Sequence, residues 1–380
     1  MVQKLNNFIA VVVLTLAANS HAALPLETMS VVSLPAKPGP HWVWVNDIAF
    51  MNMVDGRAYL IDADIGTVLG MISGGNFHDA LQLPDDHSAI YSTDTFYSRG
   101  TRGERTDVLS IYDPITLSMD GEVILPPKQL LSVPTANNMA MTTDGRFLGQ
   151  YNFTPAHSLT IVDLAARKFV SEVSTPGCAF VYPTGPRTIN MLCGDGSVLT
   201  LALGATGNVV SRNQSEPMFD APDVLVNEDA VRIGSTWYFL SYEGVVYTLD
   251  GARDTPKFGS WALHSGEADT AGWRPGGYQL FAIHPVTGRM YVSMQKGGPG
   301  THKNPGTEIW VFDINSHEQL QRVAVERHFT SIQVSNDDQP LLYTVSIETP
   351  ALEVYDALTL QHLRTVELSY GSTPTIIQIP

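Results

Sequence analysis

One two-strand unit recurs seven times along the chain, and this repeat constrains the fold more than any other feature of the sequence. Each copy has a segment in which apolar and polar residues alternate, then a turn, then a second segment, which is the pattern of a β-hairpin. One hairpin cannot bury both of its faces, so neighbouring copies are expected to cover one another. The copies occupy residues 57–72, 107–125, 157–173, 197–212, 244–261, 308–325 and 351–368.

Six of the seven copies end their first strand with an aspartate, and the fourth copy has Gly204 after Leu203 instead. A carboxylate at this place can accept hydrogen bonds from the backbone N–H groups of the turn that follows. The first and last of these aspartates are 294 residues and six steps apart, so the mean period is 49 residues. The six are Asp62, Asp113, Asp163, Asp250, Asp313 and Asp356.

Turn signals between the copies predict the other strands of each unit. These signals are Pro84-Asp85-Asp86, Thr143-Asp144-Gly145, Thr287-Gly288 and Asn336-Asp337-Asp338, and the strands expected after them are 89–91, 146–148, 289–294 and 340–345. About four strands in a unit of 40–50 residues is typical of a propeller blade. A closed ring of blades also protects the strand edges. The predicted fold is therefore all-β, a seven-bladed β-propeller of four-stranded blades over residues 41–380.

The amino terminus has the pattern of a cleavable signal peptide over residues 1–22. Lys4 supplies the positive start, and the apolar run from Phe8 to Ala18 is too short to span a bilayer. Ser20-His21-Ala22 fits a small-x-small cleavage site. The mature chain is expected to be exported and soluble, with no later membrane span. Residues 23–40 are interpreted as an arm leading into the ring, or alternatively as a segment that pairs with the last blade.

The chain has two cysteines, Cys178 and Cys193, separated by a stretch rich in proline and glycine. In an exported protein this hairpin-like spacing predicts a disulfide bond between them. Two separate buried thiols are the alternative, while a redox dithiol is not expected because the C-x-x-C spacing is missing.

Composition and motifs exclude several classes of function. Lys and Arg number 22 against 38 Asp and Glu, a formal net charge of −16, and so acidic a protein repels the phosphates of nucleic acid. The eleven histidines show no metal-ligand spacing, and no G-x-S-x-G or phosphate-binding motif is present. Neither a catalytic constellation nor a metal site is therefore expected in this chain.

Two segments are unusual for a blade repeat and are candidate subunit interfaces. Residues 98–107 place Arg99, Arg102 and Arg105 in a glycine-rich stretch, and planar guanidinium groups suit bidentate pairing with carboxylates. Residues 272–279 contain Trp273, Arg274 and Tyr278, which are residue types that anchor interfaces. The alternatives are a solvated loop for the first segment and a blade-joining turn for the second.

At these segments the sequence resembles the large (heavy) subunit of the tryptophan tryptophylquinone-dependent amine dehydrogenases, the family of methylamine and aromatic amine dehydrogenases. The resemblance covers nearly the whole mature chain. Its most specific stretches are long and ungapped: FYSRGTRGERTDVLSIYDPIT at 96–116, PGCAFVYPTGPRTINMLCGDGS at 176–197, WRPGGYQLFAIHPVTGRMYVSM at 273–294 and THKNPGTEIWVFD at 301–313.

The resemblance implies a periplasmic heterotetramer of two large and two small (light) subunits. A primary amine would be oxidised to an aldehyde with release of ammonia, and electrons would pass to a blue copper protein. The quinone cofactor would be formed from two tryptophans of the small subunit, so this chain would bind no cofactor and would act as scaffold and channel wall.

The resemblance also assigns one substrate-channel residue, Phe77, in the loop Gly74-Gly75-Asn76-Phe77-His78. An ordinary aromatic residue at a blade edge is the alternative. The substrate class stays open, because residues 300–313 resemble the aromatic amine enzymes and residues 331–346 the methylamine enzymes.

Three rival functions belong to other classes. A stand-alone propeller hydrolase would need convergent acids or a metal on the axis, and a periplasmic binding scaffold would need no chemistry at all. A quinoprotein that binds a free quinone should have a tryptophan in each blade repeat, whereas the six tryptophans here are not periodic.

Overall fold

The computed structural model describes residues 32–221, 224–251, 256–264, 272–369 and 371–380. The chain divides into two units, 1–33 and 34–380, and the second unit holds the sheets. The predicted signal peptide, 1–22, lies outside the described residues, as do residues 23–31 of the predicted arm. In the part of the chain that is described, no helix has the length and apolarity needed to span a bilayer.

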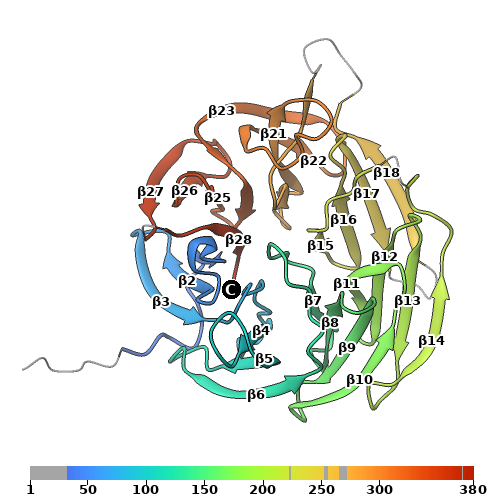
Figure 1. Ribbon diagram of the computed structural model, residues 1–380. Coiled ribbons are helices and arrows are strands. Elements are labelled where there is room, and N and C mark those ends of the chain that lie inside the picture. Colours follow the sequence, from blue (N-terminus) through green and yellow to red (C-terminus); the bar gives the residue numbers. More distant parts are fainter. Residues whose placement is uncertain (1–31, 222–223, 252–255, 265–271, 370) are drawn as a thin grey trace, which may run out of the picture. The chain divides into compact units, whose positions relative to one another are not determined.

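The described residues of the second unit form seven antiparallel sheets arranged as blades around a central axis (Figure 1). From the axis outward, blade 1 consists of β28 (Pro374–Gln378), β1 (Trp42–Asp47), β2 (Arg57–Asp62) and β3 (Thr67–Ser73), and blade 2 consists of β4 (Ile90–Tyr97), β5 (Arg105–Tyr112) and β6 (Met119–Leu125). Blade 3 consists of β7 (Met139–Met141), β8 (Phe147–Asn152), β9 (Ser158–Asp163) and β10 (Lys168–Ser174). Blade 4 consists of β11 (Cys178–Gly185), β12 (Thr188–Cys193), β13 (Val198–Leu203) and β14 (Val209–Gln214).

Blades 5 to 7 continue in the same order from the axis outward. Blade 5 consists of β15 (Val231–Ile233), β16 (Thr236–Leu240), β17 (Val245–Asp250) and β18 (Lys257–Ala262). Blade 6 consists of β19 (Trp273–Pro275), β20 (Phe281–Ile283), β21 (Arg289–Lys296), β22 (Gly306–Asp313) and β23 (Gln319–Phe329). Blade 7 consists of β24 (Ser331–Val334), β25 (Leu341–Val345), β26 (Ala351–Asp356) and β27 (His362–Glu367). A short 3-10 helix, η1 (Phe50–Asn52), lies between β1 and β2.

The predicted all-β seven-bladed propeller is confirmed, and each of the seven repeats forms the two outer strands of one blade. Five sheets have four strands. In blade 2 the place of the innermost strand is taken by two isolated bridges to β4, one between Asn76 and Thr95 and one between Gln82 and Tyr91. In blade 6 the inner strand is split into β19 and β20, which both pair with β21.

The turn aspartates accept backbone hydrogen bonds, as the repeat predicted. Oδ1 of Asp113 accepts from the N–H groups of Ile115 and Thr116, at 2.9 and 2.7 Å. The corresponding bonds are made by Asp62, Asp163, Asp313 and Asp356. Bonds of this kind favour the ionised carboxylate, and the backbone N–H of Thr116 is the main cause of a lowered pKa at Asp113. Residues 252–255, after Asp250, lie outside the described residues.

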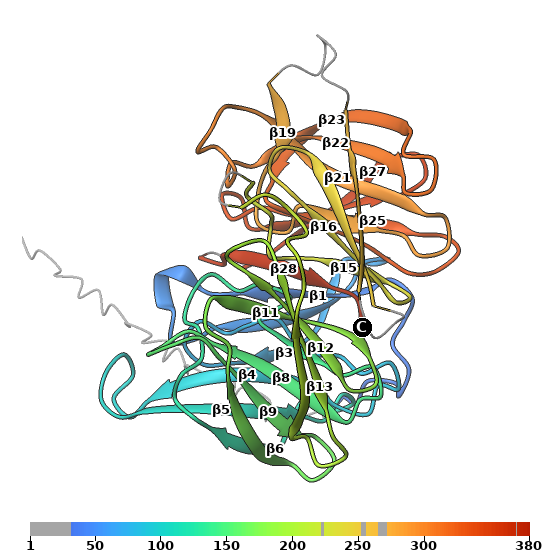
Figure 2. The same ribbon diagram turned by 90° about the vertical axis from the view of Figure 1, so that its right-hand side faces the viewer.

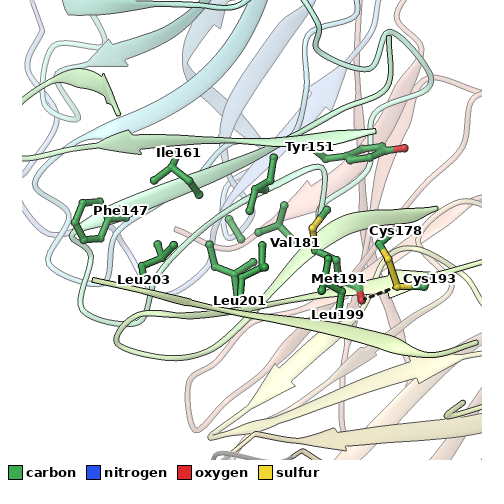
Figure 3. Packing of buried hydrophobic residues seen from close by; sticks show 13 residues of the cluster. Phe147, Tyr151, Ile161, Cys178, Val181, Met191, Cys193, Leu199, Leu201 and Leu203 are labelled. Atoms are coloured by element: carbon green, nitrogen blue, oxygen red, sulfur yellow. Dashed lines mark hydrogen bonds between the residues drawn. A yellow bond between two sulfur atoms is a disulfide. The ribbon is translucent and has the colours of Figure 1, made fainter. Parts of the chain in front are cut away.

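Apolar side chains from facing sheets fill the space between the blades (Figure 3). Phe147 and Ile161 of blade 3 pack with Val181 and Leu201 of blade 4 in one buried cluster. The disulfide lies within the same cluster, so covalent and hydrophobic contacts stabilise this pair of blades together.

Cys178 and Cys193 are joined by a disulfide bond, as predicted. They are directly opposite residues of β11 and β12, so the bridge links the two inner strands of blade 4.

Replacing both Cys178 and Cys193 with serine should lower the free energy of unfolding by about 3 kcal/mol, because closing a loop of 15 residues restricts the unfolded chain. Denaturant unfolding of the exported protein, with and without a reductant, measures the effect. Reduced wild-type protein should resemble the double variant. An unchanged midpoint in both samples would contradict the stabilising role of the bridge.

Candidate functional site

Successive strands of each blade are antiparallel, so alternate connections emerge at opposite axial ends of the ring. We call one end the turn face, which carries the aspartate turns 63–66, 114–118, 164–167, 314–318 and 357–361. We call the other end the loop face, which carries the loops 48–56, 74–79, 98–104, 126–138 and 297–305.

Phe77, the predicted channel residue, lies on the loop face in the connection from blade 1 to blade 2. Its ring is half-buried, and its backbone is in the left-handed region with φ 51°. Its N–H donates to the carbonyl oxygen of Met53 at 3.3 Å. The loop that contains Met53 also carries Phe50 and Met51, which are 59% and 84% exposed. The backbone of Phe77 is therefore bonded to a loop that carries exposed apolar side chains.

The three arginines of residues 98–107 differ in their surroundings. Arg99 and Arg102 are exposed in the β4–β5 loop of the loop face. Arg105 instead makes two hydrogen bonds of 2.7 Å to the fully buried carboxylate of Asp107, and a third to the carbonyl oxygen of Gln129. Arg99 and Arg102 are available to a partner, whereas the guanidinium of Arg105 is engaged within the chain.

The residues of 272–279 also differ. Trp273 is 8% exposed and packs on Trp310 with ring centroids 5.5 Å apart, so its ring belongs to a hydrophobic core. Arg274 and Tyr278 are half-buried. Arg274 and Tyr278 therefore expose more of their side chains than Trp273 does, and they are the better candidates for contact with a partner.

A half-buried lysine lies beside Tyr278. Nζ of Lys303 lies 5.1 Å from the ring centre of Tyr278 and 5.5 Å from that of Tyr242, within the range of cation–π attraction. It pairs with Glu228 at 3.5 Å. Burial opposes the charged ammonium, but the charge of Glu228 and the Tyr242 contact outweigh it and raise the pKa of Lys303. Lys303 is therefore charged at neutral pH and joins two blades at the loop face.

Two buried carboxylates lie near the axis and were not found from the sequence. Asp79 accepts hydrogen bonds from the Ala80 and Thr135 N–H groups and from the Asn138 amide. Burial raises its pKa to about 6 despite these bonds. Burial, and then the charge of Glu228, raise the pKa of Asp229 well above its ordinary value. A single aspartate in a loop carries no local sequence signal of such burial.

Asp229 also lines a central cavity of about 760 Å³. The lining runs from Asp85 and Asp144, in turns of the turn face, to Asn137 and Asp229 beside the loop face. The cavity has polar residues at both ends, and its lining comes from the innermost strands and adjoining loops of several blades.

One buried histidine contacts both a serine and an aspartate but is not arranged for nucleophilic catalysis. His78 uses Nδ1 for Asp94, at 3.0 Å, and also for Ser92, at 3.2 Å. A catalytic triad needs the acid and the nucleophile on different ring nitrogens. Nε2 of His78 is buried without a partner among the described residues. Those residues also contain no group of three metal-ligating side chains.

Asp79→Asn should remove a pH-dependent loss of stability. The pKa of Asp79 is about 6 in the folded protein against an ordinary 3.8, so its stabilising contribution is complete below pH 3.8 and is lost as the pH rises through 6. This gap corresponds to about 3 kcal/mol. Unfolding of both proteins at pH 4.5 and pH 7.5 should show the variant gaining relative to wild type at the higher pH. Parallel pH profiles would refute the assignment.

The comparisons with known proteins agree with one another. A family model described as "Methylamine dehydrogenase heavy chain (MADH)" matches residues 40–379. The methylamine dehydrogenase heavy chain of Paracoccus versutus is 30% identical over 91% of this chain and 81% of its own length. That of Methylorubrum extorquens is 29% identical over 84% of this chain and 78% of its own length.

Solved structures show a likeness of fold alone. A dihydro-heme d1 dehydrogenase superposes with a TM-score of 0.57 over 91% of this chain and 77% of its own, at 15% identity.

Proposed function

The chain belongs to the methylamine dehydrogenase heavy chain family, and on that premise we propose that it is the scaffold and channel-wall subunit of a periplasmic quinoprotein amine dehydrogenase. It would assemble with a light subunit in a two-large, two-small heterotetramer. The enzyme would oxidise primary amines to aldehyde and ammonia and pass electrons to a blue copper protein. The observation that carries the proposal is the family match over 40–379, which spans the whole propeller rather than a few blade repeats.

The loop face is the surface on which we place the light subunit. It exposes large apolar side chains on several blades: Phe50, Met51, Phe153 and Leu225. It also carries the exposed Arg99 and Arg102, the half-buried Arg274 and Tyr278, and the entrance residue Phe77. Apolar patches rimmed by arginine and tyrosine are typical of protein interfaces.

The cofactor is assigned to the light subunit. Among the described residues one pair of tryptophans is in ring contact, Trp273 and Trp310, and both are buried in a hydrophobic cluster, where their rings pack on other side chains. A tryptophan-derived quinone on the partner would supply the oxidation of the amine. The part of this chain would be to orient the amine and to exclude water, with Phe77 at the entrance.

The substrate is proposed to be a primary amine. The curated relatives are named as methylamine dehydrogenase heavy chains, which favours a short alkylamine over an arylethylamine. Both classes remain compatible with a half-buried phenylalanine at the entrance, so selectivity is the property to measure.

The purified chain alone should not oxidise methylamine or phenylethylamine with an artificial electron acceptor. The reason is that its described residues contain neither a catalytic triad nor a metal-ligating cluster. Adding the light subunit should produce turnover. Activity of the isolated chain after treatment with a chelator would overturn the proposal.

Phe77→Ala should change the ratio of kcat/KM for methylamine and phenylethylamine in the assembled enzyme by about tenfold, because removing a ring from a channel mouth alters which substrates fit. Phe169→Ala is the matched control, since Phe169 is an exposed aromatic on β10, the outermost strand of blade 3, away from the loop face. Phe77 would be an ordinary blade-edge residue if the two variants, both assembled, had the same ratio as wild type.

A further inference from the structure

We propose that the buried pair Asp94 and His78 positions Phe77 and thereby sets the size selectivity of the substrate entrance. This inference rests on the proposed role of Phe77. Asp94 and His78 would be positioning residues, which act on the substrate only through the loop that carries the ring.

Asp94 is a fully buried carboxylate in β4, and it contacts the loop that carries Phe77. Its Oδ1 accepts a hydrogen bond from the Gly75 N–H at 3.0 Å and lies 3.0 Å from Nδ1 of His78. Ser110 Oγ donates to its Oδ2 at 2.7 Å. Two of these contacts come from residues within two positions of Phe77. The carboxylate therefore ties both flanks of Phe77 to the blade.

The carboxylate is ionised. Burial alone would raise its pKa, but the hydrogen bond and charge of His78, with the bonds from Ser110 and Gly75, hold the pKa of Asp94 below its ordinary value. Hydrogen bonds to an ionised acceptor are stronger than neutral ones. An ionised Asp94 also requires the proton on Nδ1 of His78, since a carboxylate only accepts.

His78 is fully buried and packs closely against the backbone at two glycines. A Cβ at Gly74 would lie 2.0 Å from Nδ1 of His78, and a Cβ at Gly56 would lie 2.3 Å from its Cβ. The two glycines therefore let the imidazole pack directly on the backbone. Nε2 makes no hydrogen bond among the described residues, so the polar contacts of the ring are on the Nδ1 side.

Phe77 needs such support because its backbone is strained. A φ of 51° is unfavourable for a residue with a side chain. On the preceding side, the N–H and the side-chain amide of Asn76 both donate to the carbonyl oxygen of Thr95, at 2.8 and 3.2 Å. On the following side stands His78, bound to Asp94. Releasing His78 or Gly75 lets Phe77 relax to a negative φ, which moves the ring away from the entrance.

Asp94→Asn in the assembled enzyme tests the proposal, because it keeps the size of the side chain and removes its charge. The kcat/KM ratio for methylamine and phenylethylamine should shift in the same direction as in Phe77→Ala, by about fivefold or more. In the double variant with Phe77→Ala, the second change should add nothing. Asp163→Asn is the control, a buried carboxylate on the turn face of blade 3, and should leave the ratio unchanged.

Hydrogen exchange supplies a readout that does not depend on activity. The backbone amides of Gly75, Asn76 and Phe77 should exchange faster in Asp94→Asn and at the wild-type rate in Asp163→Asn. Unchanged exchange would overturn the positioning role whatever the enzyme does. If exchange is faster but Phe77→Ala leaves the ratio unchanged, the channel role of Phe77 fails instead.

A second pair of variants decides the matter if Asp94→Asn does not fold. His78→Asn retains an N–H donor near the place of Nδ1, whereas His78→Leu does not. The asparagine variant should have the wild-type kcat/KM ratio and exchange rates. The leucine variant should have a shifted ratio and faster exchange. Equal behaviour of the two, or an Asp94→Asn shift that persists in full without the Phe77 ring, would overturn the proposal.

Discussion

The pairing of β28 with β1 closes the ring, and the geometry of both axial faces depends on it. The last strand of the chain lies innermost in blade 1, beside the first strand (Figure 2). Its side chains and backbone also reach other blades. Gln378 exchanges two hydrogen bonds with the backbone of Leu81, and the side chain of Gln279 does the same with the backbone of Ile377. Blades 1, 2 and 6 are thus joined at the axis by one short strand.

This tie bears directly on the candidate site. Leu81 lies four residues after Phe77, on the inner segment of blade 2 where a full strand is missing. That segment is anchored at one end by Gln378 and at the other by Asp94, through Gly75 and His78. The loop of Phe77 is therefore held by one backbone bridge, between Asn76 and Thr95, and by polar contacts to buried groups rather than by a full strand ladder.

The repeats and the turn aspartates could be predicted from the sequence because their causes are local. The alternation of apolar and polar residues predicts the strands. An aspartate whose carboxylate accepts from backbone N–H groups two or three residues later predicts the turn. The Arg105–Asp107 pair could also have been predicted, since residues two apart on a strand share a face. The burial of Asp79, Asp94 and Asp229 could not, because it depends on how other segments of the chain pack around them: Asp79 contacts a residue 59 positions away, Asp229 one 93 positions away, and Asp94 residues 16 to 19 positions away in neighbouring segments. Resemblance to a family was needed to single out Phe77, which no composition or spacing distinguishes.

If this chain is the scaffold and a light subunit carries the quinone, the native assembly must contain both chains in equal numbers. The chain should be purified under native conditions from cells grown on a primary amine, and the intact complex weighed by mass spectrometry. We expect two copies of this chain with two copies of a small cysteine-rich chain that carries the quinone absorbance and a cross-linked tryptophan pair. A purified chain that oxidises amines without a partner, or that carries the quinone on its own tryptophans, would contradict this expectation.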